Sequence, residues 1–298
     1  MNIIEDIKQM CIGEVIEDVD LIKYNTYKVS SKALGIVIPD DEKGLISLLK
    51  YLRKNKIKHK ILGNGSNLIF SKDYYDGILI KLDSFQNLEI EENKITVGAG
   101  YSLVRLALRV SRLGLTGMEF ATGIPGTVGG AVFMNAGAYK TDMGYIVSSI
   151  KVLTPNYEIV TMTNKELDFH YRTSFLHKNR DYICLEATIV LNKGVKEEIM
   201  ELIEERKERR ISSQPLDYPS AGSVFRNPSN DFAGRLIEEL GYKGKGYNGA
   251  IVSEKHANFI INTGGAKGSD IKKLVYEIKN KVKEKYNIDL IIEQEIVE

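Results

Sequence analysis

The sequence is poor in the residues that mark disulfide-stabilised and metal-binding proteins. Its 298 residues contain no tryptophan and two cysteines, Cys11 and Cys184. These thiols lie far apart and form no CxxC pattern, which excludes a disulfide framework and fits a reducing cytosol. The four histidines lie at positions 59, 170, 177 and 256. Because no two of them have the spacing of a helical metal site, we expect no bound metal.

Charge and hydropathy exclude further classes of function. The net charge of +1 provides no broad basic surface for nucleic acid or membrane lipid. No apolar run approaches the roughly 20 residues that cross a bilayer. The N-terminus lacks the cationic and apolar segments of a signal peptide. We therefore expect a cytoplasmic protein of two or three domains, with no nucleic-acid and no membrane partner. We also expect a monomer whose partners are small molecules.

The spacing of apolar residues predicts a fold of the α+β class. Leu45, Leu48, Leu49 and Leu52 recur at helical spacing, and Leu103, Leu106, Val110 and Leu113 repeat the pattern before Gly114 ends the helix. The first of these helices lies between two short strands, in a βαβ-like unit. Strands are predicted at 35–38, 57–62, 77–82, 94–98, 146–153, 158–162 and 182–191.

A charged helix over residues 195–210 precedes the predicted domain boundary. Pro215 and Pro219 indicate an irregular crossing after it, and we expect the charges of the helix to form a solvated face. The sequence predicts a first domain over 20–192, divided into two lobes near residue 83, and a smaller α+β domain over 205–298. Helices near 232–240 and 269–286 and strands near 222–226 and 257–262 are expected in the second domain.

A first glycine-rich loop follows the predicted strand at 57–62. Two glycines permit a positive φ and a close approach of backbone to ligand. The amides of such a loop can converge on a phosphate without any lysine. The alternative is a plain tight turn, which Asn-Gly also favours. The loop reads Gly63-Asn64-Gly65-Ser66-Asn67.

A second, longer segment is dense in small residues, which leaves much of its surface without side chains. It matches neither the GxGxxG dinucleotide fingerprint nor a Walker loop. Either a flat or polyanionic ligand lies on it, or its glycines serve close packing of a helix on a strand. Together, the two segments fit an extended pyrophosphate cofactor. The second segment reads Gly123-Ile124-Pro125-Gly126-Thr127-Val128-Gly129-Gly130-Ala131, followed by Asn135-Ala136-Gly137-Ala138.

Both segments closely resemble the UDP-N-acetylenolpyruvoylglucosamine reductase (MurB) family. Three further segments resemble family motifs in the family's order, and the similarity spans roughly residues 20 to 298. Asn227-Pro228 runs within a few residues into the helix that carries residues 233–237. This resembles the shorter, second type of the family, which lacks an inserted substrate-covering loop. The three segments are Tyr171-Arg172-Thr173-Ser174-Phe175, Ala221-Gly222-Ser223-Val224-Phe225-Arg226-Asn227-Pro228 and Val252-Ser253-Glu254-Lys255-His256-Ala257-Asn258-Phe259.

The resemblance implies an FAD-binding domain of the vanillyl-alcohol-oxidase (PCMH) type and a C-terminal substrate domain. The implied reaction reduces the enolpyruvyl group of UDP-N-acetyl-3-O-(1-carboxyvinyl)-glucosamine to UDP-N-acetylmuramate in peptidoglycan precursor synthesis. NADPH is the hydride donor and FAD the cofactor. By the same resemblance, the residues that hold FAD are Gly63, Asn64, Gly65, Ser66, Asn67, Gly123, Ile124, Pro125, Gly126, Thr127, Val128, Gly129, Gly130, Asn135 and Gly137.

The resemblance also implies three catalytic residues. Arg172 suits the substrate carboxylate, because a guanidinium forms paired hydrogen bonds and keeps its charge. Ser223 is the proton donor to the new stereocentre. Glu293 lies beside the developing enolate, so we expect it to be protonated or paired with Arg172, with a raised pKa in the substrate complex. Each residue also has a purely structural interpretation. Asn227 and Lys255 are the candidate contacts to the sugar or diphosphate.

The chain departs from the family at two places. Val29-Ser30-Ser31 stands where relatives have a Val-Gly-Gly-like segment. Ile292-Glu293-Gln294-Glu295 stands where Pro-Glu-Val-Arg is usual, so that Glu295 remains an alternative to Glu293. Two other functions stay open: an FAD-dependent alcohol oxidase of the same fold superclass, and a non-catalytic nucleotide-sugar-binding regulator.

Overall fold

The computed structural model describes residues 2–298, which form two compact units. The first unit takes the residues up to Glu17 together with Gly35–Gly63 and Gly77–Glu208. The second takes Asp18–Leu34, Asn64–Asp76 and Arg209–Glu298. Within the described residues, every helix is too short or too polar to span a bilayer. The chain therefore enters the second unit twice before its C-terminal third.

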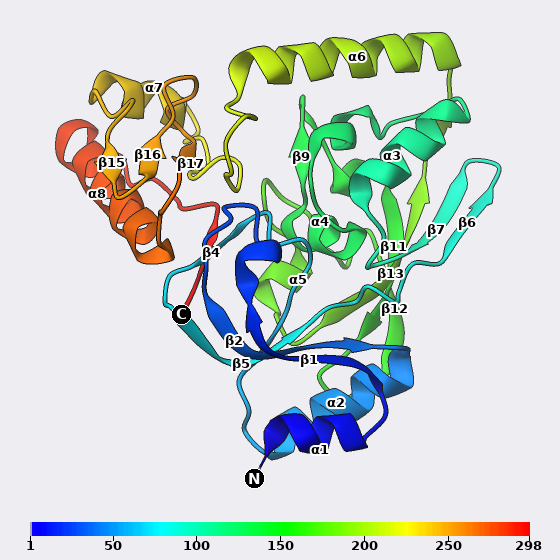
Figure 1. The fold of residues 1–298 in the computed structure, drawn as a ribbon. Helices are drawn as coiled ribbons and strands as arrows, with labels where there is room; N and C mark the ends of the chain where they lie inside the picture. Colours follow the sequence, from blue (N-terminus) through cyan, green and yellow to red (C-terminus); the bar gives the residue numbers. More distant parts are fainter. Residues whose placement is uncertain (1) are drawn as a thin grey trace. The chain divides into compact units, whose positions relative to one another are not determined.

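A five-stranded antiparallel sheet forms the centre of the first unit (Figure 1). Its central strand alternates buried and partly buried residues toward its end, because one face of the sheet carries helices. The helix α4 (Val128–Met134) packs on this strand and α3 (Leu103–Arg112) lies nearby. The strand order is β12 (Ile159–Thr163), β11 (Val147–Leu153), β13 (Ile183–Val190), β7 (Lys94–Gly98) and β6 (Leu88–Glu91).

A second sheet has the strand order β1-β2-β5-β3, in which β3 runs parallel to β5. The leucines of the predicted first helix, now α2 (Glu42–Lys54), are buried along one face. Asp41 caps this helix by accepting a hydrogen bond from the Gly44 N–H at 2.7 Å. The remaining bounds are α1 (Ile3–Gln9), β1 (Gly13–Asp20), β2 (Lys32–Pro39), β3 (His59–Ile61) and β5 (Tyr74–Ile80).

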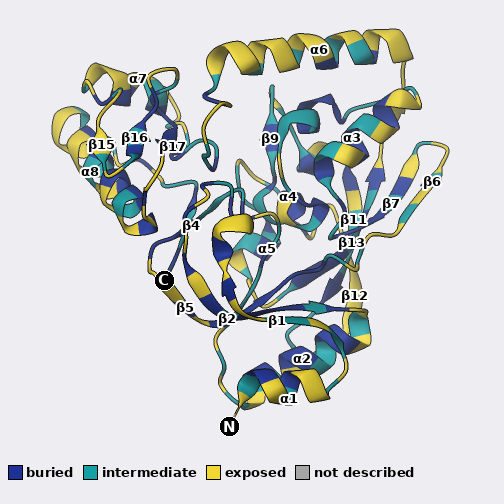
Figure 2. Ribbon diagram, viewed as in Figure 1, coloured by how far each residue is buried: buried dark blue, intermediate teal, exposed yellow. Residues whose placement is uncertain are grey.

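One long helix and several short elements follow along the chain. The long helix α6 (Lys196–Ser213) is largely exposed in Figure 2, with Ile199 and Ile203 buried, as expected for a solvated charged face. The short elements are β8 (Leu115–Thr116), η2 (Glu119–Gly123), β9 (Gly137–Ala138), β10 (Thr141–Asp142), η3 (Met143–Tyr145), α5 (Phe175–Lys178) and β14 (Asn192–Lys193).

The second unit has one hydrophobic core to which three separate parts of the chain contribute. Tyr27, Val29 and Ile69 pack in the same cluster as Val224 and Phe225. A parallel pair of β4 and β18 joins the second and third parts. The elements are η1 (Leu21–Lys23), β4 (Leu68–Phe70), α7 (Ala233–Glu239), β15 (Gly246–Tyr247), β16 (Ala250–Val252), β17 (Ile260–Asn262), α8 (Gly268–Tyr286) and β18 (Glu295–Val297).

Most elements expected from the sequence are confirmed, but two expectations were wrong and some elements were missed. The strand near 222–226 is wrong, since this segment makes only an isolated bridge between Phe225 and Ile292. Residues 128–134, interpreted as part of a loop, form α4, while α1 and β1 were missed. The functional domains at 20–192 and 205–298 stay a prediction; the compact units place 18–34 and 64–76 with the C-terminal residues.

Candidate functional site

The first glycine loop presents backbone donors that the protein leaves without acceptors. Gly65 is buried with φ at +63°, and a Cβ there would lie 2.1 Å from the Tyr24 carbonyl oxygen. Among residues 2–298, no acceptor is found for the N–H groups of Gly65 and Ser66 or for the Ser66 hydroxyl. A buried N–H without a partner is costly. The loop is therefore suited to a ligand that supplies acceptors, such as a phosphate.

The end of this loop is held by the C-terminal residues. The Asn67 side-chain amide donates to the Glu293 carbonyl at 3.0 Å. The Glu295 N–H donates to the Asn67 carbonyl at 2.9 Å, which begins the β4–β18 pairing. These bonds fix the position of Asn67 relative to Glu293 within the second unit. Two residues expected to serve cofactor and catalysis are thus adjacent.

The second glycine segment uses its amides within the protein. The N–H groups of Val128 and Gly129 donate to the carbonyls of Tyr101 and Ala99 at 2.9 and 2.8 Å. The Gly130 N–H donates to the Thr127 hydroxyl at 3.2 Å. A Cβ on Gly129 would approach the Ala99 Cβ to 2.9 Å. Close packing therefore accounts for Gly129, and any cofactor contact of this segment depends on its small-residue surface.

The two glycine segments meet inside the first unit. A Cβ on Gly63 would lie 2.9 Å from the Thr127 hydroxyl oxygen, so the start of the first loop lies against the start of α4. Lys81 is buried, donates to the Gly63 carbonyl at 3.2 Å and pairs with Asp83 at 3.2 Å. The contact between Gly63 and Thr127 brings together the two glycine-rich segments, which their spacing in the sequence had only suggested to be neighbours.

Arg172 occupies the turn of a tight hairpin. His170 and Thr173 exchange backbone hydrogen bonds of 3.0 and 3.1 Å, and Arg172 between them has φ at +56°. Its guanidinium Nη2 donates to the Gly137 carbonyl at 2.8 Å. The Asn135 side-chain amide donates to the His170 carbonyl at 2.8 Å. The structure thus brings Arg172 together with Asn135 and Gly137, all of which were predicted site residues.

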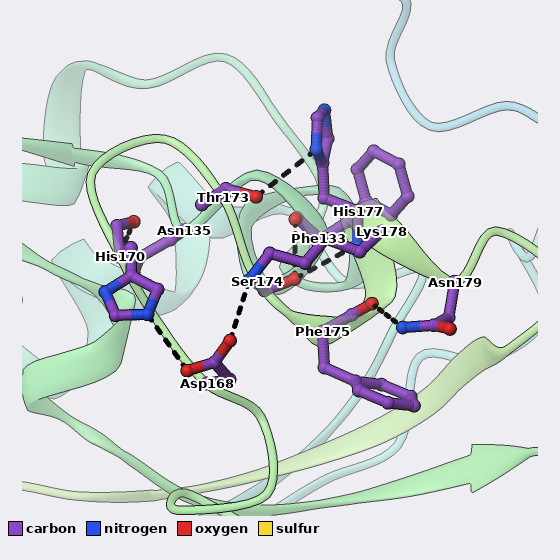
Figure 3. Close-up of polar contacts among 10 residues, drawn as sticks. All are labelled: Phe133, Asn135, Asp168, His170, Thr173, Ser174, Phe175, His177, Lys178 and Asn179. Carbon is purple, nitrogen blue, oxygen red and sulfur yellow. Dashed lines mark hydrogen bonds and ion pairs between the residues drawn. The ribbon is translucent and has the colours of Figure 1, made fainter.

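Neighbouring polar contacts hold this hairpin on α4 (Figure 3). The Ser174 hydroxyl donates to the Phe133 carbonyl at 2.8 Å and caps α5 by accepting from the His177 N–H at 3.3 Å. Asp168 pairs with Lys178 at 2.7 Å and contacts His170 at 2.9 Å. Hydrogen bonds from Lys178 and then His170 lower the pKa of Asp168. The strained backbone of Arg172 is therefore fixed by its surroundings.

In the second unit, Ser223 directly precedes a segment that is held on both sides. The Val224 N–H donates to the Asn258 carbonyl at 2.9 Å, and the Glu293 N–H donates to the Val224 carbonyl at 2.8 Å. The Asn258 side chain also bonds both backbone groups of Phe225, at 3.0 and 2.8 Å. Ser223 and Glu293 are consequently brought into adjacent, well-held segments.

The two candidate carboxylates have different surroundings. Glu293 lies in the segment bonded to Val224, one residue from Ser223. Glu295 lies opposite Leu68 in the parallel pairing. Burial, and secondly the charge of Glu295, raise the pKa of Tyr75 to about 12. The structure therefore associates Glu293 with the serine and Glu295 with Tyr75.

Asn227 and Lys255 have structural partners. The Asn227 side-chain oxygen accepts from the Ala233 N–H at 3.1 Å, at the start of α7. The Lys255 ammonium donates to the Ile211 carbonyl. Their predicted substrate contacts stay predictions. Sequence reasoning missed the supporting roles of Asn258 and Gln294, although the Gln294 departure from the family motif was a visible signal.

Two family models match the chain. The model of the UDP-N-acetylenolpyruvoylglucosamine reductase C-terminal domain matches residues 214–297. The model of an FAD binding domain matches residues 33–163. The chain is 42% identical over 297 residues to UDP-N-acetylenolpyruvoylglucosamine reductase of Halalkalibacterium halodurans, covering 99% of this chain and 98% of that protein. It is 41% identical to the same-named protein of Bacillus subtilis, with the same coverage.

Solved structures agree with these matches. The crystal structure of UDP-N-acetylenolpyruvylglucosamine reductase (MurB) from Thermus caldophilus covers 96% of this chain and 98% of its own, with 32% identity and a TM-score of 0.80. A chitooligosaccharide oxidase, at 13% identity and a TM-score of 0.51, shares the fold over 65% of this chain and 44% of its own. The predicted fold class, an FAD-binding domain of the vanillyl-alcohol-oxidase (PCMH) type with an α+β C-terminal domain, is confirmed.

Proposed function

The chain belongs to the UDP-N-acetylenolpyruvoylglucosamine reductase family, and we propose that its Arg172, Ser223 and Glu293 carry out the reduction from which the family takes its name. It is an FAD-dependent oxidoreductase of peptidoglycan precursor synthesis that uses NADPH. The predicted family, reaction and cofactors are confirmed. The alcohol-oxidase alternative has only a likeness of fold in its favour.

The first glycine loop fits the cofactor best. The partnerless N–H groups of Gly65 and Ser66 suit the diphosphate of FAD. The small-residue surface around Gly126 and Gly130 suits a flat or extended group lying against the chain. When bound, FAD supplies to the substrate a hydride that originates from NADPH. This assignment depends chiefly on one observation: the N–H of buried Gly65 has no hydrogen-bond acceptor among residues 2–298.

Arg172 is suited to bind the substrate carboxylate. Addition of hydride to the enolpyruvyl methylene carbon places negative charge on the adjacent carbon and its carboxylate. A guanidinium stabilises that charge and cannot lose its own proton. Its bond to the Gly137 carbonyl orients the arginine before substrate arrives, so little reorganisation is needed.

Ser223 is suited to donate the proton that completes the reaction. The hydroxyl is a weak acid, but an enolate-like carbon is basic enough to take its proton. Glu293, in the adjoining segment, is suited to stabilise the enolate as a neutral acid or to return a proton to the serine. The adjacency of the two segments, through the Glu293 N–H and the Val224 carbonyl, supports this pairing.

An anaerobic experiment tests the proposal. The purified holoenzyme is reduced with NADPH, and in parallel with NADH, before the enolpyruvyl UDP-sugar is added and the flavin spectrum followed. We expect the oxidised spectrum to return in the parent and to return roughly 100-fold or more slowly in Ser223→Ala. Ser229→Ala, an exposed turn residue, is the control and should match the parent. A parent that is reduced but never reoxidised by the substrate contradicts the proposed function.

We further propose that the enzyme is a cytoplasmic monomer. Neither cysteine is in a disulfide; Cys11 is exposed, and burial raises the pKa of the Cys184 thiol to about 12. Such thiols suit a reducing compartment. Light scattering after size exclusion should give the mass of one chain, 33.5 kDa. A stable mass of twice that value contradicts the monomer.

A further inference from the structure

Gln294 is a buried amide at the position where this chain departs from the family's C-terminal motif. Gln294 is only 3% exposed. The Tyr27 hydroxyl donates to its Oε1 at 2.9 Å. Its Nε2 donates to the carbonyls of Ala221 and Gly222, at 3.0 and 3.1 Å. One amide therefore satisfies three buried or partly buried polar groups from two distant parts of the chain.

The two carbonyls that accept from Gln294 immediately precede Ser223. Gly222 has φ at +75°, and a Cβ built there meets no atom within 4 Å. A side chain at Gly222 would thus make no packing contact, and the Gln294 amide bonds hold the backbone of this turn. Because Gln294 also follows Glu293 directly, the same buried group fixes the backbone next to both candidate catalytic residues.

Tyr27 holds the amide in one orientation. The residue is fully buried, and this burial raises the pKa of its hydroxyl above the ordinary value near 10, so it stays protonated and donates. With Oε1 occupied by that donor, Nε2 must face the two carbonyls. An amide without such a donor could rotate and present its oxygen to them, which would be repulsive.

We propose that Gln294, oriented by Tyr27, is a positioning residue that directs the Ser223 hydroxyl and the Glu293 carboxyl toward the substrate. The inference rests on the roles proposed above for Ser223 and Glu293. It concerns only the step in which substrate takes up hydride and proton. Transfer from NADPH to the cofactor should therefore be independent of Gln294.

Gln294→Met tests the role, because methionine has nearly the same length but no amide. We expect reduction by NADPH to stay within about twofold of the parent, and reoxidation by the enolpyruvyl UDP-sugar to slow roughly 10- to 100-fold. The solvent deuterium isotope effect on reoxidation should rise, because proton transfer from a misdirected serine becomes limiting. Gln86→Met, which removes an exposed amide that bonds only the Asp83 carbonyl, is the matched control.

Tyr27→Phe provides an independent and milder variant. Loss of one hydrogen bond that orients the amide should slow reoxidation about fivefold, again with a raised isotope effect. The double variant should be no slower than Gln294→Met alone, since both residues act in one chain of bonds. Thermal unfolding of each holoenzyme is recorded separately from the kinetics.

Different results would refute the positioning role of Gln294 and the proposed function on which it rests. Parental reoxidation rates and isotope effects in folded Gln294→Met overturn the positioning role. If that variant does not fold, the same parental values in Tyr27→Phe overturn it instead. Failure of the parent itself to be reoxidised by the substrate contradicts the proposed function.

Discussion

The two glycine-rich segments are alike in composition and different in how they use their backbone. In the first, buried Gly65 and its neighbour Ser66 keep N–H groups for which residues 2–298 provide no acceptor. In the second, the N–H groups of Val128, Gly129 and Gly130 all have protein acceptors. On our proposal the first segment binds a ligand through these amides, whereas the amides of the second segment help to pack a helix closely on the sheet.

This difference shows that glycine content alone does not identify a phosphate-binding loop. A glycine can be required because its φ is positive, because a neighbouring backbone is close, or because a ligand must reach the amide. Only the last reason is functional in a direct sense. Substitutions at the two segments should therefore separate effects on FAD affinity from effects on folding.

Gly65→Ala should have the largest effect. The new Cβ would meet the Tyr24 carbonyl oxygen at 2.1 Å in a left-handed backbone conformation. We expect a loss of about 3 kcal/mol or more in unfolding free energy, and a fall of roughly 100-fold in FAD affinity. Gly264→Ala is the control, since its φ is +118° but nothing lies within 4 Å. It should lose stability to backbone strain while FAD affinity is kept, and an equal loss of affinity would contradict the interpretation.

Gly129→Ala should have the next largest effect, mainly on stability. Its Cβ would lie 2.9 Å from the Ala99 Cβ and 3.2 Å from the Ala99 carbonyl oxygen. Overpacking at such a contact costs about 1–3 kcal/mol, offset in part by the better helix propensity of alanine. In Gly130→Ala the nearest atom is the Thr127 hydroxyl oxygen at 3.3 Å, so the effect should be smaller. Equal chemical denaturation midpoints for the two variants would contradict the packing role.

Thr127→Ala should cost about 1 kcal/mol through loss of the α4 cap. Thr127 accepts a hydrogen bond from the Gly130 N–H at 3.2 Å, and Thr127→Ser retains the hydroxyl. Denaturant titration of the three proteins measures the difference. If serine and alanine are equally destabilising, the hydroxyl is not the stabilising group.

Ser66→Ala should have the smallest effect on folding and a distinct effect on binding. The hydroxyl has no partner among residues 2–298, so its removal should change the unfolding free energy of the apoprotein by less than about 0.5 kcal/mol. FAD affinity should fall about fivefold for one lost hydrogen bond. Unchanged affinity in a fluorescence titration would remove Ser66 from the cofactor site.

The local spacing of apolar residues predicted the helices and strands better than the long-range contacts between them. Leu45 to Leu52 and Leu103 to Val110 follow helical spacing, and both stretches are helices with those residues buried. By contrast, nothing local indicates that Tyr27 contacts Gln294, 267 positions away. The expected strand near 222–226 was wrong because Asn258 replaces an extended strand ladder. Its side chain bonds both backbone groups of Phe225, and its carbonyl accepts from the Val224 N–H.

In the candidate site, too, some residues could be predicted from the sequence and others could not. Family motifs indicated Arg172, Ser223 and Glu293, whereas the Gly137 carbonyl that orients Arg172 and the Asn258 side chain that holds Phe225 follow only from three-dimensional contacts. The substrate contact of Asn227 stays a prediction. Its motif suggested a substrate contact, and its side chain bonds the start of α7.

The most direct test of the difference between the two segments is amide hydrogen exchange, measured by NMR on the apoprotein and the FAD complex. The account predicts that the amides of Gly65 and Ser66 exchange rapidly without FAD and become protected when it binds. Those of Val128 and Gly129 should be protected in both states, because Tyr101 and Ala99 accept their hydrogen bonds. Unchanged exchange at Gly65 and Ser66 on binding of FAD would contradict the account.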